Sequence, residues 1–448
     1  MPIGNDSFIF TLENDTNQQL STASATKTII AGVQNSLSLT LTGIIASFQI
    51  NPITANDTAH LIQSSGQAVS IIGAAPQKFT VTALDIDGNT ISGAPTFTSG
   101  SPKLTLSNVS GTYTAQVTSY GSSAISLTPS SGTTTIAVTT EQELWATNCQ
   151  DTTTSVYSYA LSPTGPQALS QDNISAYIPG SGACAMAVAI DAGGNRWVSD
   201  FNTGELWEFA PGTSTPTGGT YKLKLAGTNH RATGLAFDLS GNLYLADSSN
   251  SSGTHIRKYS QSSLSGTPNN TVTISSAANL PASPSSQEPT NSLAFDTAGI
   301  LWITNPYSST KSAVAYNTTS AAWVPSDTIA AETVDGDNDG QTYQVAFDPT
   351  DNGHVWLTES WKGWLERYMP GATSSSQALT NIYAGYSAFG LAIGGDGTIW
   401  TAIQDMNNNT TTAIYGYASG STTSATPVYQ ILTIPNCNYS LNMLTISP

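Results

Sequence analysis

The sequence predicts an all-β fold in which a β-sandwich region is followed by a six-bladed β-propeller closed by the C-terminal strand. Three observations predict it. One short phrase recurs five times after residue 187, each end of the recurring region carries half of a further copy, and regular strand-like runs precede it. The expected domains are a partial β unit or added strands over 1–47, the sandwich over 48–139 and the propeller over 140–448.

The recurring phrase is an apolar triplet ending in Asp or Gly, a glycine turn, and an aromatic residue that Leu or Ile precedes in three of the five copies. Its copies run from Val188 to Trp197, Leu235 to Tyr244, Leu293 to Trp302, Val345 to Trp356 and Leu391 to Trp400. The triplets end at 191, 238, 296, 348 and 394, and subtraction gives spacings of 47, 58, 52 and 46. This period suits four-stranded blades with loops of variable length.

Two half-copies predict how the ring closes. Residues 144–147 contain the aromatic strand of a repeat, around Trp145, without a triplet before it. The chain finishes with residues 443–447, an apolar strand with no partner after it. If the last strand docks as the innermost strand of the blade begun by Leu144, no sheet edge is left unpaired. The alternative, an open row of hairpins, is disfavoured because open apolar edges aggregate.

Composition limits the partners. Only 9% of the 448 residues are charged, and the net charge is −17. So few cations argue against nucleic acid and against an anionic membrane surface, and no apolar run is long enough to span a bilayer. Partners should be neutral, cationic or metal ions.

The expected location rests on composition and on the first residues. The chain begins without the basic and apolar pattern of a signal peptide, which read literally means the cytoplasm. Richness in Ser, Thr and Asn with few Lys favours instead an extracellular or cell-surface protein whose upstream segment has been removed.

Strand-like runs alternate with turns between residues 48 and 139, as in a β-sandwich. The run 81–89, followed by Ser-Gly-Thr-Tyr at 110–113, resembles bacterial immunoglobulin-like repeats of surface proteins. Residues 1–47 hold too few strands to bury a core independently. They are the remnant of a preceding sandwich, strands added to the immunoglobulin-like unit, or strands that pair with a neighbouring molecule.

The recurring phrase resembles the NHL and virginiamycin-B-lyase-like propellers and, more distantly, the gluconolactonase group. The resemblance covers about residues 141–448 and implies the fold, whereas one propeller serves binding, scaffold and enzyme roles alike. The lyase mechanism implies a His directly before an innermost strand, but no histidine precedes the triplets. His230 stands several residues too early, so that mechanism is not carried over.

Polar residues follow the blade aromatics at a constant offset. Three positions beyond each aromatic stand Asn148, Asp200, Asp247, Asn305 and Glu359. These positions end the second strands, where loops open on one face of a propeller, so we expect them to converge with His230 and Arg231 as a ligand-binding ring. Converging oxygen ligands suit calcium, which the gluconolactonase-like group uses for catalysis. Alternatively, these side chains cap turns by bonding local backbone.

A second calcium candidate is the acidic loop around residues 335–340. Asp335, Asp337 and Asp339 alternate and are followed by Gly340, which resembles the first half of a calcium loop. The usual distal Glu is missing, because Ala346 occupies that position. The alternative is a solvated acidic loop.

The chain has three cysteines, so the sequence does not determine which of them form a disulfide. A bond between Cys149 and Cys437, both near one mouth of the ring, would staple its closure. Cys184 is the rival partner, and three free buried thiols are the remaining alternative.

Aromatic residues divide into two groups. Trp361 and Trp364, in the loop after a second strand, fit sugar binding by stacking. The aromatics at one repeated strand position should pack between blades: Trp145, Trp197, Trp302, Trp356 and Trp400.

Three classes of function are consistent with the sequence. The first is a secreted or surface recognition protein, with an immunoglobulin-like spacer and a propeller head, that binds glycan or protein. The second is a calcium-dependent lactonase, lyase or glycosidase that uses the ring of acids. The third is a subunit of an extracellular assembly that self-associates.

Overall fold

The computed structural model of the chain describes residues 4–446 with gaps. The residues outside the description are 1–3, 40, 94, 121–124, 131–132, 149–153, 163–164, 171, 176–183, 215, 218–220, 226–229, 250–252, 267–269, 276–291, 305–311, 328, 330–341, 351–353, 361, 370–371, 373–378, 385–386, 405–411, 423–424, 433–440 and 447–448. The chain divides into two compact units, one of residues 1–71, 76–119 and 123–140 and one of residues 72–75, 120–122 and 141–448. The predicted boundary between residues 47 and 48 stays a prediction.

The first unit begins with an antiparallel three-stranded sheet in the order β1 (Gly4–Glu13), β2 (Gln19–Ile29) and β3 (Thr42–Gly43). Alternation in β1 places Phe8, Phe10 and Leu12 on one face, opposite Ala25, Ala23 and Ser21 of β2. Ser21 is the one residue of β1 and β2 that is buried.

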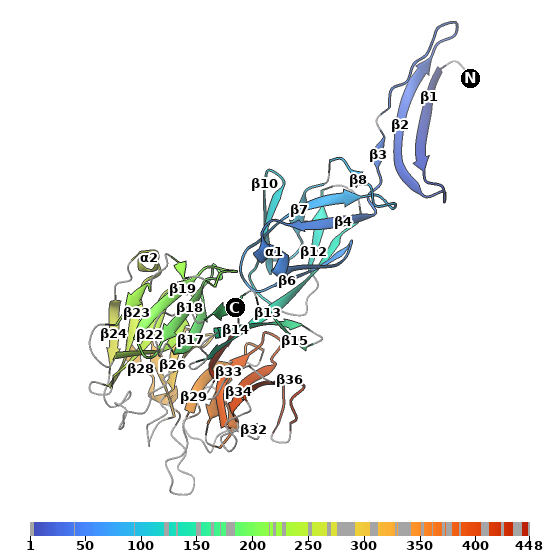
Figure 1. The fold of residues 1–448 in the computed structure, drawn as a ribbon. Coiled ribbons are helices and arrows are strands. Elements are labelled where there is room, and N and C mark those ends of the chain that lie inside the picture. The colour runs from blue at the N-terminus through green and yellow to red at the C-terminus, as the bar shows by residue number, and fades with distance from the viewer. Residues whose placement is uncertain are drawn as a thin grey trace. The chain divides into compact units, whose positions relative to one another are not determined.

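Two further sheets of the first unit form the sandwich-like part (Figure 1). One sheet contains β4 (Ser47–Pro52), β7 (Gln77–Leu84), β8 (Thr90–Ile91), β10 (Leu104–Val109) and β11 (Thr112–Val117). The other contains β5 (Leu61–Ser65), β6 (Ala68–Ile72), β9 (Phe97–Ser99), β12 (Ile125–Pro129) and the start of β13 (Ile136–Asn148). The short helix α1 (Ala55–His60) begins at Thr54, which forms a capping box with Asp57.

Aromatic side chains from both sheets fill the core between them. Phe48 of β4 meets Phe97 of β9 edge-to-face at 4.9 Å between ring centroids. Tyr113 of β11 stacks on Phe79, and its hydroxyl accepts a hydrogen bond from the Phe97 amide at 3.0 Å. The polar tip of the tyrosine is therefore satisfied inside an apolar core. Two packed sheets agree with the strand spacing of the sequence, whereas the immunoglobulin-like assignment stays a prediction.

Within its described residues, the second unit contains five four-stranded antiparallel sheets. The first contains β17 (Ala185–Ile190), β18 (Arg196–Asp200), β19 (Glu205–Phe209) and β20 (Leu223–Lys224). The second contains β21 (His230–Phe237), β22 (Leu243–Ser249), β23 (Gly253–Tyr259) and β24 (Asn270–Ser275). The third contains β25 (Leu293–Phe295), β26 (Ile300–Thr304), β27 (Ala313–Asn317) and β28 (Ala322–Trp323). The fourth contains β29 (Thr342–Phe347), β30 (Val355–Glu359), β31 (Trp364–Tyr368) and β32 (Thr380–Tyr383), and the fifth β33 (Ser387–Ile393), β34 (Ile399–Gln404), β35 (Thr412–Tyr417) and β36 (Tyr429–Leu432). The short helices α2 (Gln261–Leu264) and η2 (Pro325–Asp327) lie between strands.

A sixth sheet joins the two ends of this unit. It contains the last residues of β13, then β14 (Thr154–Ser162), β15 (Gly165–Ala168), β16 (Ile174–Ser175) and β37 (Leu441–Ile446). β37 pairs antiparallel with β13, with Leu144 opposite Ile446 and Ala146 opposite Leu444. This is the pairing that the two half-copies of the phrase predict.

The Asp of the recurring phrase folds the turn between the first two strands of a sheet. Asp191 Oδ1 accepts from the amides of Gly193 and Asn195 at 2.8 and 2.9 Å. Its Oδ2 accepts from the indole nitrogen of Trp197 at 3.0 Å. Asp238 and Asp296 bond their turns in the same way. The phrase recurs because a similar backbone turn recurs in the five four-stranded sheets, with Asp as its cap in four copies and Gly394 in its place in the fifth.

Aromatic side chains of the phrase pack between neighbouring sheets, as predicted. Trp197 meets Phe237 of the next sheet at 6.1 Å between centroids, and Trp302 meets Phe347 at 5.9 Å. The same clustering brings Trp400 of the fifth sheet against Leu444 of β37. All five predicted core tryptophans are buried: Trp145, Trp197, Trp302, Trp356 and Trp400.

The innermost strands contact one another in a closed series. The series runs β17, β21, β25, β29, β33 and β37 and returns to β17. The second unit therefore has a β-propeller-like fold. Among the described residues, no helix is both long enough and apolar enough to cross a membrane.

Candidate functional site

Four of the five predicted ring residues lie in second strands, with buried side chains. Asn148, Asp200 and Glu359 end β13, β18 and β30, while Asp247 lies in β22, two residues before its end. The fifth, Asn305, lies outside the described residues.

Asp200 binds its own loop. Its Oδ1 accepts from the Asn202 amide at 2.8 Å and from the amides of Thr203 and Cys184 at 3.3 Å. Burial raises the pKa of the Asp200 carboxyl, and the bonds from these amides oppose that rise. Asp200 therefore caps the turn after β18 through Oδ1, while its role as a calcium ligand stays a prediction.

Replacing Asp200 by Asn should change how stability depends on pH. The Asp200 carboxyl has a higher pKa in the folded state than in the unfolded state. Its protonation therefore stabilises the folded state at pH below the unfolded-state pKa, and this stabilisation is lost as pH rises through the folded-state pKa. Asn does not titrate, so only the wild type loses this contribution. The free energy of unfolding of Asp200→Asn, measured relative to wild type, should therefore rise as pH increases from mildly acidic to neutral. Urea denaturation at several pH values measures this, with the exposed Asp15→Asn as control. A relative stability that is flat with pH would contradict it.

Asp247 is the centre of a charged cluster. It is fully buried, and its Oδ1 lies 2.8 Å from Nδ1 of His230, the first residue of β21. Its Oδ2 accepts from Nε of Arg257 at 2.6 Å and lies 2.5 Å from Nη2 of the same guanidinium. Both carboxylate oxygens are thereby engaged with protein donors.

His230 lies beside the buried Asp247 carboxylate and is partly exposed. When Nδ1 donates to the carboxylate, Nε2 holds the lone pair of the neutral ring. The side chain is 20% exposed, while Asp247 is completely covered. A buried carboxylate that orients a partly exposed imidazole is the arrangement by which proteins build a general base.

The neighbouring sheet approaches closely at this point. Gly204, in the turn between β18 and β19, has φ +65°, and a Cβ there would lie 2.8 Å from the His230 carbonyl oxygen. Arg231 extends over the ring of Phe201, with its guanidinium carbon 4.3 Å from the centroid. His230, Arg231, Asp200 and Asp247 thus belong to two sheets that touch. Their convergence as a ligand-binding ring stays a prediction.

The other predicted ligands have different surroundings. Glu359 Oε1 accepts from the Thr342 hydroxyl at 2.7 Å, across the paired ends of β29 and β30. Trp364 is half-buried and lies 5.1 Å from the Tyr383 ring. Four further predicted ligands lie outside the described residues, and their assignments stay predictions. They are the calcium candidates Asp335, Asp337 and Asp339 and the aromatic residue Trp361.

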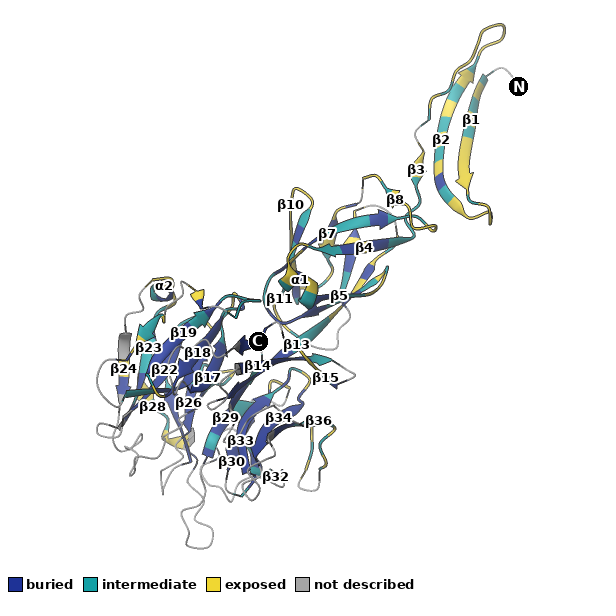
Figure 2. Ribbon diagram, viewed as in Figure 1, coloured by how far each residue is buried: buried dark blue, intermediate teal, exposed yellow. Residues whose placement is uncertain are grey.

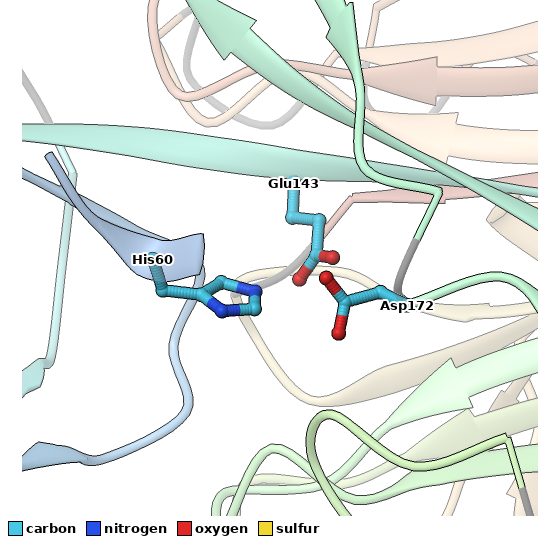
Figure 3. Close-up of side chains that lie close together, drawn as sticks. All are labelled: His60, Glu143 and Asp172. Carbon is cyan, nitrogen blue, oxygen red and sulfur yellow. The ribbon is translucent and has the colours of Figure 1, made fainter. Parts of the chain in front are cut away.

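A buried charged cluster was missed by sequence reasoning. The carboxylates of Glu143 and Asp172 face each other, with an oxygen of each within 4.8 Å of the other (Figure 3). Arg196 Nη1 lies 3.9 Å from Asp172 Oδ1, and the guanidinium sits 5.0 Å from the Trp145 ring centroid. Burial lowers the pKa of Arg196, and the two acids oppose this effect. One signal was present, because Arg196 occupies the position before the aromatic where other copies have Leu, Ile or Val.

The predicted disulfide is wrong. Cys184, which precedes β17, is disulfide-bonded. With three cysteines in the chain, Cys184 takes one of the two sulfurs that the predicted bond between Cys149 and Cys437 needs. Both of these residues lie outside the described part of the chain. The alternative with Cys184 as partner is the one that the structure supports.

Comparison with solved structures finds similarity at low sequence identity. No protein-family model and no curated protein matches the sequence. A protein of unknown function from Bacteroides caccae is 9% identical, covers 68% of this chain and 99% of its own, and has a TM-score of 0.46. Virginiamycin B lyase from Staphylococcus aureus is 11% identical, with coverages of 80% and 96% and a TM-score of 0.34. Aldose sugar dehydrogenase from Streptomyces coelicolor, in its PQQ-bound form, is 12% identical, with coverages of 56% and 81% and a TM-score of 0.39. Likeness at this level says nothing about activity.

Proposed function

We propose that this protein is an enzyme that opens a lactone or a related ester, and that His230 is its proton-transferring residue. The observation that carries this proposal is the 2.8 Å contact between His230 Nδ1 and the fully buried Asp247 carboxylate. We further infer that the six sheets form a closed six-bladed propeller and that the two packed sheets of the first unit are an immunoglobulin-like spacer.

The proposed reaction uses residues at the touching ends of two sheets. His230 Nε2 takes a proton from water, and the resulting hydroxide adds to the acyl carbon of the ester. Asp247 stabilises the imidazolium that forms, while Arg257 holds Asp247 in position. When the C–O bond breaks, Nε2 returns its proton to the leaving alkoxide. Arg231 supplies positive charge beside the site for an anionic substrate group.

Two other candidate activities have less support. A glycosidase needs two carboxylates free to act on the sugar. Both Asp247 oxygens are bound by His230 and Arg257, and Asp200 is completely buried. Recognition of a glycan stays a prediction, since Trp364 packs on Tyr383 and Trp361 lies outside the described residues. Calcium dependence and an extracellular location are likewise proposals.

An assay on a panel of lactones and aryl esters tests the proposed function. His230→Gln should lower kcat/KM about 10²- to 10⁴-fold, the usual loss on removing a general base. Asp247→Asn should also lower kcat, because it changes the tautomer of His230. The matched control is His354→Gln, in the turn between β29 and β30, which should retain activity.

Two results would contradict the proposal. One is hydrolysis that survives His230→Gln, and the other is a wild-type chain inactive on the whole panel in both calcium and chelator. Parallel assays with calcium and with chelator also reveal whether the reaction depends on a metal ion.

A further inference from the structure

The outer edge of β1 is unpaired among the described residues. β1 pairs with β2 on one side only. It is ten residues long, contains neither proline nor lysine, and carries large apolar side chains, with Ile9 77% exposed. Figure 2 shows β1 in the colours of exposed and intermediate residues. Proteins normally protect an edge with a short strand, proline, lysine or an internal bulge. The register of β1 shifts only at its last residue, Glu13, so the rest of the edge is a regular template for another strand.

The sequence of β1 is self-complementary about Ile9. Phe8 and Phe10 flank Ile9, and the hydroxyl residues Ser7 and Thr11 flank them in turn. Two such strands, antiparallel and related by a two-fold axis at Ile9, place Phe8 of one copy opposite Phe10 of the other. Ser7 likewise lies opposite Thr11. Aromatic and hydroxyl cross-strand pairs stabilise sheets, so the strand matches its own copy.

The charges on β1 fit the same pairing. With the axis at Ile9, Asp6 lies opposite Leu12 of the second copy and Glu13 lies opposite Asn5. No two acids meet, although the strand carries two. Asn5 Oδ1 already accepts from the Thr28 hydroxyl at 2.5 Å, so its Nδ2 is the group that it offers to a carboxylate. The two ends of the pair are therefore complementary in charge and hydrogen bonding.

We propose that β1 pairs with β1 of a second copy of this chain, antiparallel and centred on Ile9. The two three-stranded sheets then become one continuous sheet of six strands. Phe8, Phe10 and Leu12 of both copies lie on one face, next to Ala23 and Ala25 of β2. A two-fold interface of this kind closes on itself, so the product is a dimer and not a fibre.

Sedimentation velocity of the full chain over a wide concentration range tests the proposal. Wild type should form a dimer and nothing larger. Ile9→Lys and Ile9→Glu should each weaken dimerisation roughly tenfold or more, because two like charges face each other across the axis. An equal mixture of the two variants should recover a dimer, because the introduced ammonium group of one copy then faces the introduced carboxylate of the other.

The matched control is Ile62→Lys, an exposed isoleucine of β5, which should leave the mass of the wild type unchanged. Circular dichroism melts check that all variants fold. The proposal is overturned by a wild type that stays monomeric, by a mass that grows beyond the dimer, by an Ile9→Lys variant that dimerises normally, or by a mixture that stays monomeric.

Discussion

Removal of residues 441–448 will prevent native folding of the second unit or lower its free energy of unfolding by more than about 5 kcal/mol. This deletion takes away β37, whose residues Met443 and Leu444 are buried against two clusters. Full burial of each such side chain contributes about 1.5–3 kcal/mol. The deletion also removes the partner of β13 and leaves an apolar sheet edge open.

The single substitution Gln344→Leu tests the same closure without shortening the chain. The Gln344 side chain donates from Nε2 to the Leu444 carbonyl at 2.6 Å, and its Oε1 accepts from the amides of Leu444 and Leu391 at 3.0 and 2.8 Å. One buried amide thus links β29, β33 and β37. Since each buried backbone group left unsatisfied costs about 1–3 kcal/mol, we expect a loss of about 3–5 kcal/mol.

Guanidinium denaturation followed by tryptophan fluorescence measures both variants. The matched control is Gln430→Leu, an exposed glutamine of β36, which should change stability by less than about 0.5 kcal/mol. If Gln344→Leu or the deletion retains the stability of the wild type, β37 does not hold the second unit closed.

Replacement of Arg196 by Leu is expected to cause a large loss of stability, although Leu is the residue type that the recurring phrase favours there. Arg196 is buried and donates to the carbonyls of Asp172 and Thr213 at 2.9 and 2.6 Å, and also to that of Ala210. Its positive charge is attracted to the carboxylates of Asp172 and Glu143. Removing one partner from a buried charged cluster costs about 3–5 kcal/mol.

The loss on Arg196→Leu should depend on pH. Without the guanidinium, two buried carboxylates face each other with no cation beside them, so the variant should lose most stability where both carboxylates are ionised. The deficit relative to wild type is therefore expected to be largest at neutral pH and smaller in acid. Urea denaturation at neutral and acidic pH measures it. As control, Arg231→Leu loses an interaction with Phe201 worth about 0.5–1 kcal/mol, and equal losses in both variants would refute the argument.

Much of the propeller-like unit was predictable because its sheets pack against one another in the same way. The turn at residue 191 and the buried aromatic at Trp197 have counterparts in all five four-stranded sheets, so they recur in the sequence at a readable period. The pairing of β13 with β37 was predictable as well, because each half-copy of the phrase lacks what the other supplies.

The candidate site was predictable only in position. The offset from the aromatics located Asp200 and Asp247 correctly near strand ends, but it did not show that Arg257 and His230 occupy both oxygens of Asp247. These contacts depend on the register of three strands and on the irregularity between Ala232 and Leu235. The disulfide prediction was wrong for a similar reason. That two loops lie at the same end of the ring does not decide which cysteines bond.

The sequence by itself determined the all-β composition, the repeat of the sheets and the residues that pack between them. These properties follow from local alternation and turn chemistry, which act over a few neighbouring residues. Only the tertiary structure decided which charges meet, such as Arg196 with Asp172 and His230 with Asp247. Electrostatic and hydrogen-bond partners are chosen over distances of a few ångströms between strands far apart in the chain, and no periodic pattern records that choice.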